Sequence, residues 1–283
     1  MSRIYEALRQ RERENRSKGL DSPEPVISAV LPNHGIPEPA EPIGIRPAVV
    51  EARATSRLVA LTEPRSLGAE KFRSLATRLE NLRRERALKS VQITSSVVGE
   101  GKTLVSANLA ITLAAECAAK VLLIEGDLRR PALASRLGLT DLTGLHQWWD
   151  TRDQGLTQFL YRLNQWPLFF LAAGGVWDQP SHLLQSRRFA DAFLSMTGAF
   201  DWIVVDSTPM TPAVDASLWS RLVDGTLLVV REGVAPVNAV KKGLEALDNP
   251  KLLGVVLNEA SEFDRTYYQD QYYTSQEKEL YES

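Results

Sequence analysis

The amino-acid sequence predicts an α/β fold with three layers, in which helices flank both faces of a mostly parallel central sheet. Short apolar runs alternate with segments of helical length through the middle of the chain. Strands that are apolar on both faces are typical of parallel sheets covered by helices. The alternation of strand and helix indicates the same layered class. The apolar runs are residues 91–94, 121–124, 168–171, 202–205, 226–230 and 253–257.

Size and composition favour a globular domain without a strong net charge. The chain has 283 residues, and its 44% hydrophobic content is enough for a substantial core. Its 33 basic and 35 acidic residues nearly cancel, so no overall field recruits nucleic acid or an anionic membrane. We therefore expect no nucleic-acid partner. The single cysteine, Cys117, stands among small residues, which predicts a buried thiol in a reducing compartment.

The N-terminal region is expected to lie outside the folded core. Residues 1–18 have apolar positions at helical spacing among many Arg and Glu residues, which predicts a short basic helix. Residues 19–52 are rich in proline and lack periodicity, which indicates a linker. The N-terminus lacks the apolar core of a secretory signal peptide. Charged residues interrupt the most hydrophobic stretch, residues 109–124, so no membrane span is predicted. We expect a cytoplasmic protein that meets a membrane only through a partner.

The folded core is predicted over residues 53–260, beginning with a helix at residues 66–86 and a strand at residues 91–94. That strand leads into the run SSVVGEGKT at residues 95–103, and a helix follows. A strand, a glycine loop and a helix in this order form a phosphate site: backbone amides at the helix start face the anion, Lys102 meets the β- and γ-phosphates, and Thr103 ligates Mg²⁺. The nucleotide-binding residues predicted here are Val98, Gly99, Glu100, Gly101, Lys102, Thr103 and Leu104.

Acidic residues follow two further apolar runs. Glu125 and Asp127 come at the end of one run, and Asp206 comes directly after another. Carboxylates at the carboxyl ends of parallel strands, beside a phosphate loop, can hold Mg²⁺ or take a proton from an incoming hydroxyl. A simpler alternative for Asp127 and Asp206 is that each caps a helix or a strand end. The order of the three elements favours the catalytic interpretation. The predicted catalytic set is Lys102, Glu125, Asp127 and Asp206, with Thr103, Asp127 and Asp206 at the metal.

The C-terminal segment, residues 261–283, is polar, acidic and rich in tyrosine, which predicts a flexible tail. A nucleotide site and a set of phenolic hydroxyls on one chain indicate phosphoryl transfer from ATP to tyrosine. Chance clustering, or packing on a neighbouring surface, is the simpler alternative. The tail tyrosines are Tyr267, Tyr268, Tyr272, Tyr273 and Tyr281.

With these motifs in place, the chain resembles the bacterial tyrosine kinases of capsule and exopolysaccharide synthesis, a branch of the P-loop ATPases. The resemblance covers about residues 67–258 and the tail. Residues 1–8 also look like the soluble members of that family, whose membrane activator is a separate polypeptide. The matching motifs are EKFRSL at 70–75, the phosphate loop, DLRRP at 127–131, LAAG at 171–174, PSHLL at 180–184, DWIVVD at 201–206, DG at 224–225 and GVVLN at 254–258.

The resemblance implies roles for several residues. The five tail tyrosines would be phosphoacceptors, and Asn258 would contact adenine. Rings in this family form when one subunit's tail enters its neighbour's site, aided by an acidic and two basic residues on the first helix. Glu70 and Arg73 fit that pattern, but the third position is Ala76. A second departure is Glu125, where the family normally has aspartate.

The sequence therefore predicts an ATP- and Mg²⁺-dependent protein-tyrosine autokinase that controls polysaccharide synthesis or export, with a membrane co-polymerase or activator as partner and self-association as a further property. Two alternatives remain open. One is a positioning or partitioning ATPase (ParA/MinD-like), although such proteins place an additional lysine early in the phosphate loop and this loop begins Ser95-Ser96. The other is an adaptor that binds ATP without catalysis.

Overall fold

The computed structural model describes residues 45–50, 57–163, 166–210, 214–246 and 251–259. All of them belong to the compact unit Pro42–Ser283. The predicted N-terminal helix, most of the predicted linker and the tyrosine-rich tail at residues 261–283 lie outside the described residues. Across the residues that are described, no helix is both long and apolar enough to cross a membrane.

The described strands form one eight-stranded sheet in the order β1-β4-β5-β3-β6-β2-β7-β8. Neighbouring strands run parallel except for β4 and β5, which are antiparallel. This arrangement confirms the predicted mostly parallel sheet. The strands are β1 (Arg46–Ala48), β2 (Ser90–Ser95), β3 (Val121–Glu125), β4 (Leu160–Leu163), β5 (Leu168–Leu171), β6 (Trp202–Asp206), β7 (Gly225–Arg231) and β8 (Leu252–Asn258).

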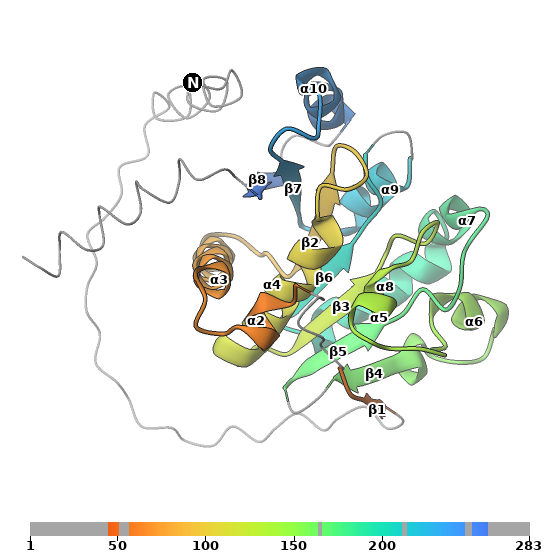
Figure 1. Cartoon of the computed structure of the whole chain (residues 1–283). Coiled ribbons are helices and arrows are strands. Elements are labelled where there is room, and N and C mark those ends of the chain that lie inside the picture. Colours follow the sequence, from red (N-terminus) through yellow and green to blue (C-terminus); the bar gives the residue numbers. More distant parts are fainter. Residues whose placement is uncertain (1–44, 51–56, 164–165, 211–213, 247–250, 260–283) are drawn as a thin grey trace, which may run out of the picture. The chain divides into compact units, whose positions relative to one another are not determined.

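Helices cover both faces of the sheet, as Figure 1 shows. Alternate residues of the central strands enter different hydrophobic clusters: Leu123 packs with α3 and α4 on one face, and Leu122 packs with α6, α7, α8 and α9 on the other. The three predicted layers are thus confirmed. The helices are α2 (Val59–Thr62), α3 (Leu67–Glu85), α4 (Lys102–Glu116), α5 (Leu133–Arg136), α6 (Leu145–Asp150), α7 (Pro180–Leu184), α8 (Arg187–Ala199), α9 (Asp215–Leu222) and α10 (Val237–Ala246), with a 3₁₀ turn at Leu156–Phe159.

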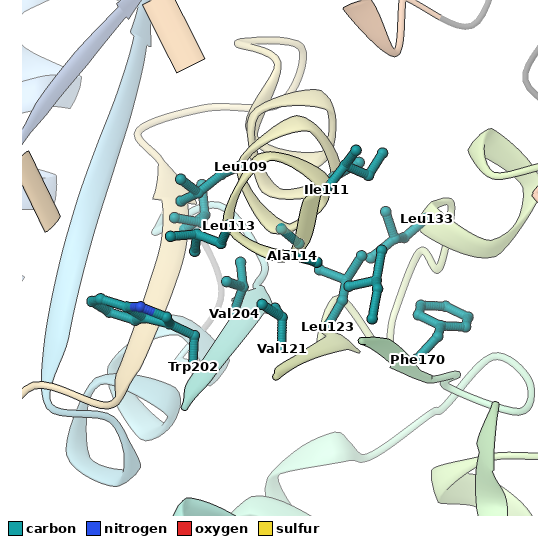
Figure 2. Close-up of a cluster of buried hydrophobic side chains, with 14 of the residues drawn as sticks. Leu109, Ile111, Leu113, Ala114, Val121, Leu123, Leu133, Phe170, Trp202 and Val204 are labelled. Carbon is teal, nitrogen blue, oxygen red and sulfur yellow. The ribbon is translucent and has the colours of Figure 1, made fainter. Parts of the chain in front are cut away.

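Helix α4, which follows β2, is deeply buried. Its residues from Val105 to Ala114 are all buried, because the helix lies between α3 and the sheet. Figure 2 shows Leu113 and Ala114 on the side of α4 that faces Val204 of β6 and Val121 of β3. The Ala and Leu residues of α4 have high helix propensity, and their side chains pack against α3 and the sheet. The start of α4 is therefore held rigidly over the carboxyl ends of the strands.

Two strands and one side chain differ from the sequence prediction. Strand β1 lies inside the stretch predicted as linker, residues 19–52, and the short strand β4 was not predicted. The short sequence Arg46-Pro47-Ala48 contains a proline and did not indicate a strand. Strands at the edge of a sheet, however, tolerate proline. The prediction of a buried thiol at Cys117 was wrong. This residue follows the last residue of α4 in an exposed turn, where Ala115 and Ala118 are exposed although Ala114 and Ala119 are buried.

Truncating Leu123 tests the packing between α4 and the sheet. Leu123 is fully buried in the cluster of Figure 2, so Leu123→Ala should lower the free energy of unfolding by about 2–5 kcal/mol. Leu194→Ala on α8 is a matched control, because that side chain is 69% exposed and its loss should cost within about 0.5 kcal/mol. Urea unfolding measures both values. Equal losses for the two variants would contradict the packing described here.

Candidate active site

The phosphate loop joins β2 to α4 through two glycines with left-handed backbone angles. Gly99 and Gly101 have φ values of 92° and 93°, and Gly101 is the N-cap of α4. A Cβ atom at Gly101 would lie 2.1 Å from the side-chain nitrogen of Asn258. Glycine is thus required at Gly101 both by its φ value and by the close approach of a neighbour. The backbone amides of the first helical turn have no partner within the helix, so this end of α4 suits an anion.

Glu100 fixes the shape of this loop from within. Its side chain is fully buried, and its carboxylate accepts hydrogen bonds from the backbone amides of Val97 (2.8 Å) and Arg231 (3.3 Å). The side chain of Asn258 donates to the carbonyl of Glu100 at 2.9 Å. Asn258, the predicted adenine contact, therefore lies against the loop, where it supports the backbone. The ends of β7 and β8 are tied to the loop by these contacts.

Lys102 stands at the centre of the site. Its ammonium lies 2.9 Å from Oδ2 of Asp127 and 3.4 Å from Oδ1 of Asp206. It also lies 3.3 Å from the hydroxyl of Thr103. Strand β6 is between β2 and β3, so the sheet places Asp206 directly between the phosphate loop and the segment that carries Asp127. The structure thus brings together Lys102, Thr103, Asp127 and Asp206, four of the residues predicted for this site.

Burial makes the charges of this cluster depend on one another. Burial favours a neutral Lys102, but the charges of Asp206 and Asp127 outweigh that effect, so the pKa of Lys102 is raised. Burial also raises the pKa of Asp206, and the charge of Lys102 opposes this rise. The lysine is consequently protonated at neutral pH. Its charge offsets part of the effect that burial has on the pKa of Asp206.

The donor set fits Mg²⁺ bound together with nucleotide phosphates. Oδ2 of Asp206 is buried and has no hydrogen-bond partner among the described residues. A buried oxygen of this kind calls for a ligand. Within the described ranges, no group of three or more His, Cys, Asp or Glu side chains could hold a metal by itself. Mg²⁺ commonly uses one or two carboxylates plus substrate phosphates, and Thr103, Asp127 and Asp206 offer that partial set.

Asp127 makes a local contact with the backbone and also faces Lys102. Its Oδ1 accepts a hydrogen bond from the amide of Arg130 at 3.2 Å, while Oδ2 contacts Lys102. Next to it, the guanidinium of Arg129 pairs with Asp215 at the start of α9, at 2.5 and 3.3 Å. Asp215 is buried. The segment that carries Asp127 is therefore anchored to α9 as well as to Lys102.

Glu125 is not part of this cluster. Its Oε1 accepts from the amide of Ala134 at 2.9 Å, and its Oε2 accepts from the amide of Ala173 at 3.0 Å. It is the register partner of Asp206 in the neighbouring strand, but its carboxylate is directed to backbone amides. The catalytic role predicted for Glu125 thus has no contact in this structure that supports it.

The residues predicted for self-association are paired within one chain. Arg73 binds Glu70 through two nitrogens, at 2.9 and 2.6 Å, and also contacts the carbonyl of Pro64. Ala76 is buried against the core, so the third position of the pattern does not face solvent. The predicted phosphoacceptors, Tyr267, Tyr268, Tyr272, Tyr273 and Tyr281, lie outside the described residues.

Sequence reasoning missed two polar residues of the site. The hydroxyl of Ser106 lies 3.4 Å from Oδ1 of Asp206, one helical turn after Lys102. A hydroxyl at that spacing was a usable signal, since residues four apart share a helix face. Asp215 was also missed. The signal for it was weak, because nothing in the sequence links an acid at a helix start to Arg129, which lies 86 positions earlier.

Comparison with known proteins relates the chain to a kinase family. The tyrosine-protein kinase YwqD of Bacillus subtilis is 32% identical over 209 residues, which is 73% of this chain and 87% of the relative. The crystal structure of the chimerical protein CapA2B2 matches with a TM-score of 0.66 and 29% identity, over 76% of this chain and 94% of that one. The septum site-determining protein MinD of Pyrococcus horikoshii, complexed with Mg-ADP, matches with a TM-score of 0.51 and 26% identity, over 62% and 72% of the two chains. No family model matches the sequence.

Removing Lys102 tests the electrostatic description of the site. In Lys102→Met, two carboxylates lose their shared cation, and the free energy of unfolding at neutral pH should fall by roughly 3–5 kcal/mol. The pKa of Asp206 in the folded state would rise further above its unfolded value. The folded state would then bind more protons than the unfolded state, so the stability of the variant should decline as the pH rises through that pKa. Urea unfolding across a pH series measures the effect.

The matched control for this experiment is Asp206→Asn, which removes the buried carboxylate and leaves Asp127 to pair with Lys102. We expect a smaller loss of stability than in Lys102→Met. The difference in stability between Lys102→Met and the wild type should shrink on acidification. A difference that stays constant with pH would contradict the coupling between Lys102 and Asp206.

Proposed function

The chain belongs to the bacterial tyrosine kinase family, and from that membership we propose that it is an ATP-dependent protein-tyrosine autokinase that regulates capsule or exopolysaccharide synthesis and export. The observation that carries the proposal is the cluster at the start of α4, where Lys102 meets Asp127 and Asp206 beside a glycine loop. The match to YwqD, which is named a tyrosine-protein kinase, covers 87% of the length of that relative.

Phosphate binding is the first task of these residues. The amides at the start of α4 and the ammonium of Lys102 would hold the β- and γ-phosphates of ATP, and the loop residues Val98 to Leu104 would surround them. Lys102 now pairs with two carboxylates, so phosphate would take over part of that pairing. Asn258 lies at the same end of the sheet, and its contact with adenine remains part of the proposal.

Mg²⁺ would be held by Thr103, Asp127 and Asp206. When bound, it supplies positive charge that neutralises the phosphates. The similarity to a MinD structure that contains Mg-ADP supports a nucleotide with magnesium in this fold. The unpaired Oδ2 of Asp206 is the atom of this chain best suited to face the ion or its water.

A tyrosine hydroxyl needs a base, because its pKa is about 10. Asp127 is the best placed carboxylate, since it lies at the rim of the cluster and is 6% exposed, whereas Asp206 is 1% exposed. It would accept the phenolic proton as the oxygen attacks the γ-phosphorus, while the bond from that phosphorus to the bridging oxygen breaks and ADP leaves. We propose Tyr267, Tyr268, Tyr272, Tyr273 and Tyr281 as acceptors. Each transfer would add roughly 1.5–2 negative charges to an acidic tail, which would weaken its return to a site lined by carboxylates.

We further propose that the kinase acts at the cytoplasmic face of the membrane through a separate membrane activator. The similarity to the chimera named CapA2B2 supports a partner of the CapA type. Self-association through Glu70 and Arg73 also remains a proposal. It would require these side chains to exchange their contact with each other for contacts with a second subunit.

Mass spectrometry after incubation with Mg-ATP tests the proposed activity. We expect phosphotyrosine in the tail of the wild-type protein and a loss of at least a hundredfold in Lys102→Met. A variant with all five tail tyrosines changed to phenylalanine should still bind ATP, because the tail is not part of the phosphate loop. Asp127→Asn should bind ATP but transfer phosphate slowly.

Other outcomes would favour the alternative functions. Hydrolysis of ATP without phosphotyrosine would indicate a positioning ATPase of the MinD type. ATP binding with neither activity would indicate an adaptor. Either result would refute the proposed kinase activity.

A further inference from the structure

Glu125 is the last residue of β3, and both oxygens of its carboxylate are hydrogen-bonded. Both oxygens accept hydrogen bonds from backbone amides, one from Ala134 on α5 and one from Ala173 after β5. The side chain is 2% exposed. Hydrogen bonds to an ionised acceptor are stronger than neutral ones, so this carboxylate is a firm link between two segments that are far apart in the sequence.

The linked segments frame the active site. The first, residues 126–133, leaves β3, carries Asp127 and Arg129, and leads into α5. The second begins at Ala172, where β5 ends next to β3. Gly126 at the start of the first segment is packed so closely that a Cβ atom would lie 2.7 Å from Val205 and 3.0 Å from the carbonyl of Asp206. With Gly126 held at one end and Ala134 at the other, the position of Asp127 is strongly constrained.

The three carboxylates at this edge of the sheet therefore differ in what they contact. Asp127 and Asp206 face the ammonium of Lys102. Glu125, although it is the register partner of Asp206, faces amides. Because its carboxylate is directed at amides of α5 and of the segment after β5 instead of at Lys102, Glu125 is poorly placed to take a proton from a substrate beside that lysine.

The length of the side chain explains how Glu125 reaches both amides. An aspartate at this position would be shorter by one carbon–carbon bond, about 1.5 Å, and could not keep two hydrogen bonds of 2.9 and 3.0 Å without movement of the backbone. Glutamine has the right length, but it would direct an NH₂ group at one of the amides and lose that bond.

We propose that Glu125 is a positioning residue, which ties the segment carrying Asp127 to the end of β5 and so holds Asp127 against Lys102. Asp127 and Asp206 are then the carboxylates that touch the nucleotide and its metal. The catalytic part of this inference rests on the proposed kinase function, and the structural part does not.

The test uses the full-length protein with Glu125→Asp, Glu125→Gln and an exposed control on α3, Glu85→Gln. Three quantities are measured: amide hydrogen exchange at Ala134 and Ala173, the Kd for Mg-ATP, and the pH profile of tail phosphorylation. We expect at least tenfold faster exchange at one or both amides in both Glu125 variants. The Kd should rise about tenfold or more, because Asp127 is displaced. The control should leave all three quantities unchanged.

The pH profile separates positioning from proton transfer. A positioning role predicts that Glu125→Gln lowers the plateau of the profile and keeps its acidic limb, which Asp127 supplies. It also predicts that Glu125→Asp is slower than the wild type. If Glu125 were the base, Glu125→Gln would abolish the acidic limb, while Glu125→Asp would retain a carboxylate and a rate equal to or above that of the wild type.

Either of the two results expected for a base would overturn the proposal, and so would unchanged exchange at both amides. If the wild-type protein forms no phosphotyrosine, the proposed function fails. In that case the exchange rates and the Kd for Mg-ATP still decide whether Glu125 positions Asp127.

Discussion

The pairing of one buried lysine with two buried carboxylates is the interaction on which the rest of this structure depends. Lys102 reaches Asp127 and Asp206 only because β6 lies between the strand of the phosphate loop and β3. A charge in a space of low dielectric is costly unless it is paired with an opposite charge. The buried helix α4 holds the lysine, and the contacts of Glu100 and Glu125 hold the loops on either side. Much of the polar network thus serves to keep one cation between two anions. Bound phosphate would use that same cation.

The parts of the fold that depend on local pattern could be predicted from the sequence. The six apolar runs became β2, β3, β5, β6, β7 and β8, because short apolar runs that alternate with helical segments are typical of parallel strands. Five of these strands are almost entirely buried, whereas β8 at the sheet edge is only partly buried. Glycines at the phosphate loop and acids after the strands located the site, since such elements meet at one edge of a parallel sheet. Features that depend on distant partners could not be predicted. The edge strand β1 pairs with the distant strand β4, and the direction of the Glu125 side chain depends on amides at positions 134 and 173.

The two departures from the family pattern have different structural meanings. Glu125 is longer than the usual aspartate, and that length is used to bridge two loops. Ala76 is shorter than the usual basic residue, and it lies buried under the hydrophobic cluster that joins α3 and α4. A charged side chain there would enter the core, which is costly unless it is paired. Residue type alone does not separate these cases. The first substitution redirects a polar group within the site, whereas the second places a small apolar residue at a buried position of α3.

A crystal structure of the wild-type protein with Mg²⁺ and a non-hydrolysable ATP analogue would show whether bound phosphate draws Lys102 away from its carboxylates. We expect the ammonium of Lys102 to move from Asp127 toward the β- and γ-phosphates. We also expect Oδ2 of Asp206 to lie close to the metal or to a metal-bound water. Contacts between Glu125 and the amides of Ala134 and Ala173 should persist. A complex in which Lys102 remains paired with both carboxylates, while the metal binds elsewhere, would contradict these expectations.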